Sequence, residues 1–497
     1  MKSGKKYILS IDQGTTSCRT LLVDHQARVL AVAQEEFTQI FPQPGWVEHN
    51  AEEIWQRQYS TLLRVIDQSG ISLEEIACIG ITNQRETTLI WDKKTGVPVR
   101  NAIVWQDRRT AQMCQEWREK GWADHFREKT GLVVDAYFSA SKLRWMLDHV
   151  PGLEKRAHEG ELAFGTIDSW LVWKLTQGNS HITDVSNASR TLLYNIHSMN
   201  WDAELLDLLQ VPENMLPAVT DSSGILAEAI IGGVKIPICG IAGDQQAALF
   251  GQQCVKPGMV KNTYGTGCFM LMNTGETPIS SSNQLLTTVA WRYMGKTVYA
   301  LEGSVFIGGA VVQWLRDGLQ IIDSATKVEH LALMAPENEG VYFVPSFTGL
   351  GAPYWNQEAR GSIFGITRGT TQSHIARAAL EAIAYQSYDV LKAMEKDAGI
   401  KIIEMRVDGG ATANQLLMQF QCDILDCELV VPVNTESTAM GAAFLAGLAM
   451  GIWDDENEIS RMVIPDKKYT SSIDDSRRNQ LLAGWQKAVK ASIAWTT

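Results

Sequence analysis

Two strand–turn–strand units with the same order, about half a chain apart, restrict the fold of this 497-residue sequence more than any other feature. In the first unit, apolar β-rich runs at residues 7–11 and 19–24 flank a turn rich in Gly, Thr and Ser at 12–17. Residues 259–272 repeat this order around a Gly-Thr-Gly turn. Apolar β-rich runs bounded by such residues are typical of strands joined by tight turns.

Alternating strand and helix patterns fill the chain between and after these units. Residues 52–66 have the spacing of a helix, and residues 77–81 form an apolar run that ends at a polar cluster. Such alternation predicts an α/β architecture. A chain of 497 residues has room for two large domains, at roughly 100–200 residues each. We therefore predict two similar domains with a boundary near Gln252, although chance recurrence of a common turn would give the same pattern.

Charge and cysteine usage argue against several classes of function. The net charge is −12, whereas proteins that bind nucleic acid or anionic membranes need clustered positive charge. Eight cysteines without a C-x-x-C pair argue against zinc and redox sites. Residues 1–6 do not open a signal peptide, and the longest apolar stretch, at 439–453, is too short and too rich in glycine to span a membrane. We expect a cytoplasmic protein without a nucleic-acid partner.

The first turn carries a strong chemical signal. Within eight residues it has a carboxylate, a glycine, three hydroxyls and a guanidinium: Asp12, Gly14, Thr15, Thr16, Ser17 and Arg19. A plain hairpin turn also favours Asp, Gly, Thr and Ser, but it does not need the whole set. Backbone N–H groups, hydroxyls and arginine donate to phosphate oxygens, and a carboxylate can hold Mg²⁺ through water. We therefore predict a phosphate clamp, with Asp12 as the residue that holds the metal.

Three later segments could face the same ligand. Asp244 follows an apolar strand at 236–242, where α/β folds place ligands, although an Asp there can also be a helix cap. The second turn, at 262–267, could approach the phosphates from the other domain. Residues 408–414 place paired glycines before a helix, which suits a nucleotide but equally an ordinary strand-to-helix turn.

Several other enzyme classes lack their motifs in this chain. There is no G-x-x-x-x-G-K-[ST] loop for a Walker-type nucleotide site, and no G-x-G-x-x-G opens a βαβ unit. The H-R-D and D-F-G motifs of protein kinases and the H-E-x-x-H motif of zinc proteases are also missing from the sequence.

Taken together, these motifs resemble the FGGY carbohydrate kinase family, within the actin and sugar-kinase superfamily. Residues 137–149 are similar to the first signature of the family, and residues 361–381 contain a segment similar to the second. The resemblance covers nearly the whole chain. It implies an α/β fold of two actin-like (ribonuclease H-like) domains, each a mixed β-sheet flanked by helices, with an active-site cleft between them. The N-terminal domain would span residues 1–252 and the nucleotide-binding C-terminal domain residues 253–497.

Within this family, the chain looks like the members that act on glycerol. The segments that carry this likeness are residues 43–49, 82–87, 105–109, 242–248 and 347–355. The resemblance implies glycerol contacts from Arg85, Glu86, Trp105, Tyr137, Asp244, Gln245 and Phe269. It implies ATP contacts from Thr15, Thr16, Ser17, Arg19, Thr266, Gly309, Gln313, Gly410 and Asn414.

The chemistry of Arg85 and Glu86 agrees with such a ligand. A donor and an acceptor side by side can bond hydroxyl groups, and a site that bonds each hydroxyl rejects analogues lacking one. A solvated surface pair is the alternative, but the two residues directly follow a buried strand. The resemblance implies phosphoryl transfer from ATP to a terminal hydroxyl, with Asp244 as base and Mg²⁺ as cofactor, in a homodimer or homotetramer. A kinase of another polyol or of a pentulose, or a non-catalytic actin-fold ATP switch, remains an alternative.

Overall fold

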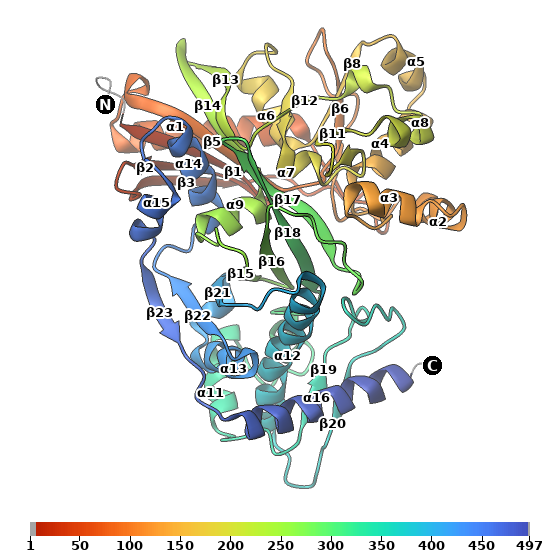
Figure 1. The fold of residues 1–497 in the computed structure, drawn as a ribbon, viewed down its shortest axis with the longest axis vertical. Helices are drawn as coiled ribbons and strands as arrows, with labels where there is room; N and C mark the ends of the chain where they lie inside the picture. The colour runs from red at the N-terminus through yellow and green to blue at the C-terminus, as the bar shows by residue number, and fades with distance from the viewer. Residues whose placement is uncertain (1–5, 496–497) are drawn as a thin grey trace.

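The computed structural model describes residues 6–495, and it contains two large mixed β-sheets, each flanked by helices (Figure 1). The predicted α/β fold is therefore confirmed. Part of the segment on which the cytoplasmic expectation rests, residues 1–5, lies outside the described residues. Within residues 6–495 no helix has both the length and the apolar character that a bilayer crossing requires.

The first sheet has the strand order β13-β14-β5-β1-β2-β3. Its strands are β1 Tyr7–Gln13, β2 Ser17–Asp24, β3 Val29–Glu36, β5 Ile76–Asn83, β13 Ser223–Ile231 and β14 Val234–Gly243. β5 runs parallel to both β1 and β14, and the register pairs Gln13 with Asn83 and Asn83 with Gly243. The three strands therefore end side by side at one edge of the sheet.

The second sheet has the order β17-β18-β16-β15-β21-β22-β23. Its strands are β15 Met259–Tyr264, β16 Cys268–Gly275, β17 Leu286–Tyr293, β18 Lys296–Val305, β21 Glu404–Asp408, β22 Glu428–Pro432 and β23 Pro465–Tyr469. The β15–β16 hairpin runs beside the parallel strand β21, as the β1–β2 hairpin runs beside β5. Thr263 pairs with Asp408, so the turns after β15 and β21 also lie at one edge.

Helices cover both faces of each sheet, and smaller β-pairs complete the chain. The helices of the first half are α1 Ala51–Ser69, α2 Ala111–Glu119, α3 Ala123–Thr130, α4 Ser139–His149, α5 Leu153–His158, α6 Ile167–Leu175, α7 Val185–Ala188, α8 Ala203–Leu209 and α9 Asp244–Gly251. Those of the second half are α10 Ala310–Asp317, α11 Val328–Leu333, α12 Gln372–Ala398, α13 Gln415–Leu425, α14 Ser437–Ala449, α15 Glu456–Met462 and α16 Asp475–Ala494. The two-stranded pairs are β4 Glu48–His49 with β7 Ala102–Ile103, β6 Leu89–Asp92 with β8 Leu162–Gly165, β9 Ile182–Asp184 with β12 Ala218–Thr220, β10 Tyr194–Asn195 with β11 Asn200–Trp201, and β19 Tyr342–Val344 with β20 Ser362–Phe364.

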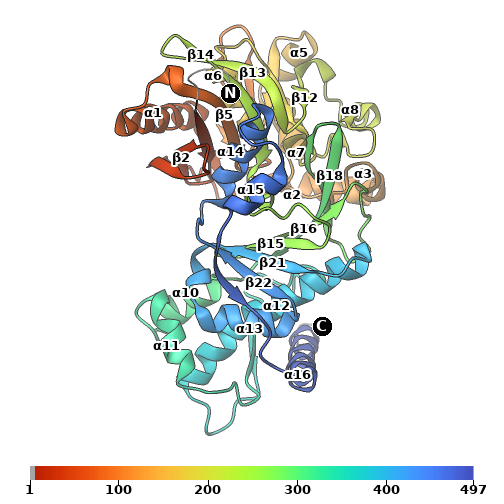
Figure 2. The same cartoon turned by 60° about the vertical axis from the view of Figure 1, so that its left-hand side comes forward.

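The alternation of side chains along β1 assigns its two faces to two different hydrophobic clusters. Leu9 packs in the cluster with α1 and α6, whereas its neighbour Ile8 packs in the cluster with α9 and α14. α14 belongs to the second half of the chain, yet it lies against β1, β5 and β14 of the first sheet (Figure 2). The packing of the first sheet therefore needs residues beyond the predicted boundary at Gln252, and that boundary stays a prediction.

Glycines allow α14 to approach its neighbours at backbone distance. A Cβ atom on Gly441 would overlap the carbonyl oxygen of Ala247 in α9, and one on Gly251 would overlap that of Ser437. A Cβ on Gly80 of β5 would likewise overlap the Ala442 carbonyl. These close contacts hold the first half of α14 against α9 and against the middle of β5.

Candidate active site

Arg85 and Asp244, far apart in the sequence, are in direct contact. They follow the ends of β5 and β14, and 3.2 Å separates Arg85 Nε from Asp244 Oδ1. The carboxyl ends of neighbouring parallel strands are the usual place for ligand-binding residues in α/β sheets. Gly243, not Asp244, occupies the capping position of α9. Asp244 Oδ1 accepts from Gln245 N at 2.7 Å, whereas Oδ2 has no hydrogen-bond partner among the described residues, and the side chain remains 31% exposed.

The guanidinium of Arg85 directs all its N–H groups at protein acceptors. Its Nη1 and Nη2 atoms donate to the two carboxylate oxygens of Glu302, over 2.6 and 3.1 Å. Nη1 also donates to Gln246 Oε1 at 3.2 Å, and Nη2 to the Tyr137 hydroxyl oxygen at 3.3 Å. With Nε facing Asp244, a ligand hydroxyl that binds Arg85 must replace one of these weaker partners.

Glu86 combines a strained backbone with a carboxylate that has one oxygen available. Its φ is +60°, a conformation that non-glycine residues adopt rarely and chiefly where function requires it. Arg190 Nε donates to Oε1 at 2.7 Å, and among residues 6–495 nothing donates to Oε2. Burial raises the pKa of Glu86, although Arg85 and Arg190 oppose the shift. Oε2 can therefore accept a hydrogen bond from a ligand hydroxyl.

Two of the predicted aromatic residues, Trp105 and Tyr137, lie beside this pair, and Arg85 Nη2 donates to the Tyr137 hydroxyl oxygen. The two rings meet edge to face with centroids 5.6 Å apart, and Trp105 Nε1 donates to Thr15 Oγ1 at 3.1 Å. The apolar wall and the first turn are thus directly joined. Phe269 is half-buried on β16 opposite Ser304, and it makes no ring–ring contact within the described residues. Phe269 is therefore not held in place by a ring contact with Trp105 or Tyr137.

Gln245 contacts a buried cation that the sequence did not single out. Lys261 on β15 donates from Nζ to Gln245 Oε1 and, over 2.9 Å, to Thr263 Oγ1. Burial lowers the pKa of Lys261, whereas the carboxylates of Asp408 and Asp244 act to raise it. This ammonium links the turn of the second sheet to the residue after Asp244.

The first turn, between β1 and β2, is a hairpin turn in which Thr16 is exposed and Thr15 and Ser17 are half-buried. Gly14 N donates to Ser17 O over 2.9 Å. Ser17 Oγ accepts a hydrogen bond from Gln34 at 2.9 Å. Arg19 forms an ion pair with Glu436, which directly precedes α14. The turn therefore touches both halves of the chain.

Asp12 lies opposite Arg19 in the β1–β2 pairing, within the field of two further carboxylates. Burial raises the pKa of Asp12 to about 7; attraction from Arg19 opposes this shift, and repulsion from Asp244 and Glu436 adds to it. A cation held here would remove that repulsion. Within residues 6–495 no group of three His, Cys, Asp or Glu side chains could hold a metal unaided. A single carboxylate, that of Asp12, is enough for Mg²⁺, because this ion keeps several waters and takes phosphate oxygens as further ligands.

The second turn is joined to the start of α10. Gly309 N donates to Gly265 O at 2.8 Å, and Gly308 N to Thr266 O at 2.9 Å. Thr266 and Gly309 are thus neighbours, with Gln313 exposed one turn further along α10. Thr263 pairs with Asp408, the last residue of β21, so the predicted segment at 408–414 begins at the same edge.

Residues 408–414, after β21, have in part the structure of an ordinary strand-to-helix turn, which was the alternative to a nucleotide site. Gly409 has φ +92°, and a Cβ there would overlap the Tyr264 carbonyl oxygen. Gly410 is exposed and faces open space. Asn414 caps α13, because its side-chain oxygen accepts from Leu417 N at 2.8 Å. Its amide nitrogen remains as a donor for a ligand.

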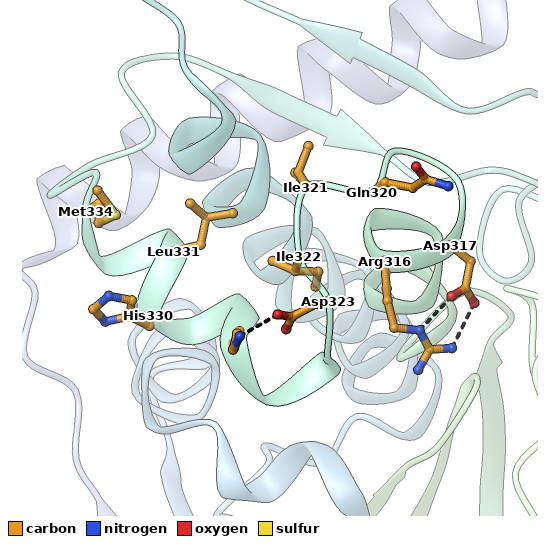
Figure 3. A pocket seen from close by; sticks show the side chains of 10 residues that line it. Arg316, Asp317, Gln320, Ile321, Ile322, Asp323, His330, Leu331 and Met334 are labelled. Atoms are coloured by element: carbon orange, nitrogen blue, oxygen red, sulfur yellow. Dashed lines mark hydrogen bonds and ion pairs between the residues drawn. The ribbon is translucent and has the colours of Figure 1, made fainter.

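A hollow of about 700 Å³ lies apart from the charged residues, between the end of α10 and α11 (Figure 3). Arg316, Asp317, Ile322 and Leu331 line it, and Figure 3 shows Arg316 paired with Asp317. None of the predicted site residues lines this hollow. It begins one helical turn beyond Gln313, on the same side of α10.

Several residues of the charged cluster were missed from the sequence. They are Arg190, Gln246, Lys261, Glu302 and Glu436. Lys261 directly follows the apolar pair Met259-Val260, and Glu302 directly follows the apolar run at 298–301; a charged side chain beside such a run is rarely buried unless it is paired. That signal was visible in the sequence, whereas nothing local identifies Arg190 or Glu436.

Comparisons with known proteins cover both halves of the chain. The FGGY family of carbohydrate kinases matches with its N-terminal domain over residues 7–251 and with its C-terminal domain over residues 260–450. A glycerol kinase of Burkholderia pseudomallei is 58% identical over 492 residues, which are 99% of this chain and 98% of the relative. A glycerol kinase of Desulforamulus reducens is 58% identical over 496 residues, 99% of each.

Solved structures share the whole architecture. The structure of Plasmodium falciparum glycerol kinase with ADP covers 99% of both chains with a TM-score of 0.94 and 37% identity. A xylulose kinase of Lactobacillus acidophilus covers 99% of this chain and 100% of its own with a TM-score of 0.88, but at 23% identity this likeness concerns the fold alone.

Proposed function

Since this chain belongs to the FGGY family of carbohydrate kinases, we propose that it transfers the γ-phosphoryl group of ATP to glycerol, giving sn-glycerol 3-phosphate and ADP. Relatives that are 56–58% identical over nearly the full length are named glycerol kinase. The single structural observation that carries the proposal is the contact between Arg85 and Asp244, 3.2 Å apart, beside the available oxygen of Glu86.

Glycerol has the size and the chemistry of this site. Its hydroxyls need an acceptor and a donor, which Glu86 Oε2 and the exchangeable N–H groups of Arg85 supply. Its carbon chain needs an apolar wall, which Trp105 and Tyr137 supply and which Phe269 extends from β16. Gln245 adds an amide beside Asp244. A site of this kind leaves its own buried polar groups unpaired when an analogue lacks a hydroxyl, and so it discriminates strongly.

Asp244 acts as the base in the proposed reaction. Its carboxylate accepts the proton of the attacking terminal hydroxyl while that oxygen forms a bond to the γ-phosphorus and the bond to the β-phosphate oxygen breaks. Arg85 keeps the carboxylate beside the substrate. Most of the rate enhancement comes from this positioning and from charge stabilisation, because phosphoryl transfer asks for little covalent chemistry from a protein.

The nucleotide lies across the two turns in this proposal. Thr15, Thr16, Ser17 and Arg19 donate to phosphate oxygens from the first sheet. Asp12 would hold Mg²⁺, which neutralises charge on the phosphates when bound. From the second sheet, contacts to ATP come from Thr266, Gly309, Gln313, Gly410 and Asn414.

Residues 1–252 carry the phosphate contacts and the glycerol contacts other than Phe269, and residues 253–497 carry the nucleotide contacts, with α14 returning to the first sheet. The chain works in the cytoplasm, where ATP is available, and as a homodimer or homotetramer. Light scattering of the purified protein tests the assembly state.

A substrate panel tests the function. Coupled ADP-release assays compare kcat/KM for glycerol, dihydroxyacetone, D-ribulose, D-xylulose and erythritol at saturating ATP. Glycerol is expected to give the highest value. A ketopentose that exceeds glycerol would replace the proposal with a pentulose kinase, and ATP hydrolysis indifferent to every polyol would replace it with an ATP switch.

A further inference from the structure

Four charged side chains are buried together beside the proposed glycerol site: Arg85, Glu86, Arg190 and Glu302. None of the four is more than 2% exposed. Arg85 and Glu86 have a direct role in the proposed function, on which this inference rests, whereas Arg190 and Glu302 have none. We propose that Glu302 and Arg190 are positioning residues, which fix Arg85 and Glu86 in the arrangement that distinguishes glycerol from polyols lacking one of its hydroxyls.

Glu302 fixes the orientation of Arg85. Its two oxygens accept from both terminal nitrogens of Arg85, over 2.6 and 3.1 Å, and a two-point contact of this kind fixes the plane of a guanidinium. Burial would raise the pKa of Glu302, but attraction from Arg190 and Arg85 outweighs it and lowers that pKa to about 2. The carboxylate is therefore ionised at every physiological pH and holds Arg85 continuously.

Arg190 connects Glu302 to Glu86. Its Nη2 donates to Glu302 Oε1 at 2.9 Å, and its Nε donates to Glu86 Oε1 at 2.7 Å. Oε1 of Glu302 thus receives one N–H from each guanidinium, which keeps two like charges side by side. Because Arg190 occupies Oε1 of Glu86, which also lies 3.8 Å from Arg85 Nε, the other oxygen is left as the acceptor for a ligand.

The cluster has features that stability alone does not explain. Buried ion pairs rarely stabilise a fold more than apolar residues of the same size. Glu86 has an unfavourable positive φ, and Arg190 Nη1 has no hydrogen-bond partner among the described residues. Local rules are broken in this way chiefly where function requires a fixed geometry.

Glu302 is fixed to the first half of the chain although it belongs to the second. Its strand β18 and the adjacent β17 form a ribbon that contacts α7 (Figure 1). Ser189 and Thr288 share a hydrogen bond of 2.9 Å, and the Tyr299 hydroxyl donates to Ile196 O at 2.8 Å. The ribbon therefore keeps Glu302 against Arg85 and Arg190 even if the rest of the second sheet moves.

Substrate discrimination separates positioning from a merely structural role. Glu302→Gln and Arg190→Gln are compared with the parent for kcat and KM with glycerol, propane-1,2-diol and propane-1,3-diol, and for KM of ATP. Each variant is expected to raise the KM for glycerol by about tenfold to a hundredfold, with the KM for ATP within about twofold. The ratio of kcat/KM between glycerol and either diol is expected to fall at least about fivefold, and the double variant is expected to lose less than the product of the single losses.

The matched control is Glu381→Gln in α12, another buried carboxylate paired with an arginine, Arg377. It is expected to keep both KM values and the glycerol-to-diol ratio. If Glu302→Gln does not fold, Glu302→Asp keeps the buried charge and shortens its reach, and it is expected to show the same loss of discrimination in part. An unchanged ratio in a folded Glu302 variant, or equal losses for glycerol, diols and ATP, overturns the inference. A parent enzyme that does not turn over glycerol overturns the proposed function instead.

Discussion

Asp244 is the residue on which the proposed proton transfer depends. Replacing it by Asn keeps the size of the side chain but removes the proton acceptor, so kcat is expected to fall about 10²–10⁴-fold, the usual range for a general base. The affinity for ATP is expected to change less than about threefold, because the predicted nucleotide contacts lie elsewhere. A coupled assay measures kcat, and calorimetry with a non-hydrolysable ATP analogue measures binding.

Asp221→Asn is the control for Asp244, since Asp221 is also partly exposed and paired with an arginine, Arg292. It is expected to keep kcat within about twofold. Turnover near the parent value in Asp244→Asn would remove Asp244 from the base role. Parallel loss of ATP affinity would instead indicate that the variant disturbs the first turn.

Asp12 is expected to govern the requirement for Mg²⁺. In Asp12→Ala the carboxylate that would hold the ion is gone, so the Mg²⁺ concentration for half-maximal rate is expected to rise about 10–100-fold. Saturating Mg²⁺ is expected to restore part of kcat. Titration of the rate with Mg²⁺ at fixed ATP measures this, with Asp24→Ala as a control remote from the turn. An unchanged Mg²⁺ requirement would contradict the role of Asp12.

A site residue could be predicted from the sequence where its position follows from a nearby strand, and not where it depends on partners that are distant in the sequence. Arg85 and Asp244 were assigned to the site through the family resemblance, and the place of each after an apolar strand supports the assignment because strand ends converge in α/β sheets. Glu302 had a visible signal, a charge directly after the apolar run at 298–301, but its partners are set by the pairing of β18 with β16 and by contacts with the first half. No local pattern specifies that long-range pairing.

At the scale of elements, the crossing of α9 and α14 positions the start of α9, where Asp244 lies. In Gly441→Ala the new methyl would overlap the Ala247 carbonyl oxygen, so the helices must separate. Overpacking of this kind costs about 1–3 kcal/mol, and the shift of α9 is expected to lower kcat as well. Urea unfolding and kcat measure the two effects. Ala449→Ser, at the half-buried end of the same helix, is expected to change neither, and an equal loss there would contradict the argument.

The docking of α16 on α12 is expected to depend on pH through Asp389. This buried carboxylate accepts from Trp485 Nε1 at 2.6 Å and from the Tyr354 hydroxyl at 2.9 Å, and burial raises its pKa from 3.8 to about 7. Between these values the folded chain keeps the proton and the unfolded chain releases it. Stability from this group is therefore lost as pH rises from about 4 to 7.

Asp389→Asn is expected to remove that dependence. Its Tm should match the parent near pH 4.5 and exceed it by roughly 2 °C near pH 8, because one carboxylate has a small effect on Tm in a chain of this size. Differential scanning calorimetry across this range measures the difference. A Tm gap that does not widen with pH would show that Asp389 is not the titrating group.

Individual helices and strands were predicted more accurately than the elements against which they pack. The helical spacing at 52–66 corresponds to α1, and the runs at 7–11 and 19–24 lie within β1 and β2. The apolar stretch at 439–453 was judged unfit to span a membrane, and most of it is α14, apolar nearly all round because it is buried between a sheet and α9. Length and glycine content excluded a membrane span for this segment, but they could not show that it is buried against the other half.

For the whole molecule, a division near Gln252 would cut through packing contacts, because elements of the second half pack against the first sheet and α7. A fragment of residues 1–252 would lack α14 and the β17–β18 ribbon, which cover one face of the first sheet and the buried charged cluster. Ile8 and Val23, fully buried in the intact chain, would then face water, and Arg85 and Arg190 would lose the carboxylate between them. We therefore expect the fragment alone to bind a hydrophobic dye and to unfold without a cooperative transition in urea.

Co-expression with residues 253–497 is the matched comparison, because it supplies the missing helix and ribbon without a covalent link. The two fragments are expected to co-purify and to regain a cooperative transition and measurable glycerol phosphorylation. Far-UV circular dichroism and the coupled assay measure both. If residues 1–252 unfolded cooperatively alone, with the stability of the intact chain, the contribution of α14 to the first sheet would be small. The second half would then contribute to the glycerol site mainly through Glu302, Lys261 and Phe269.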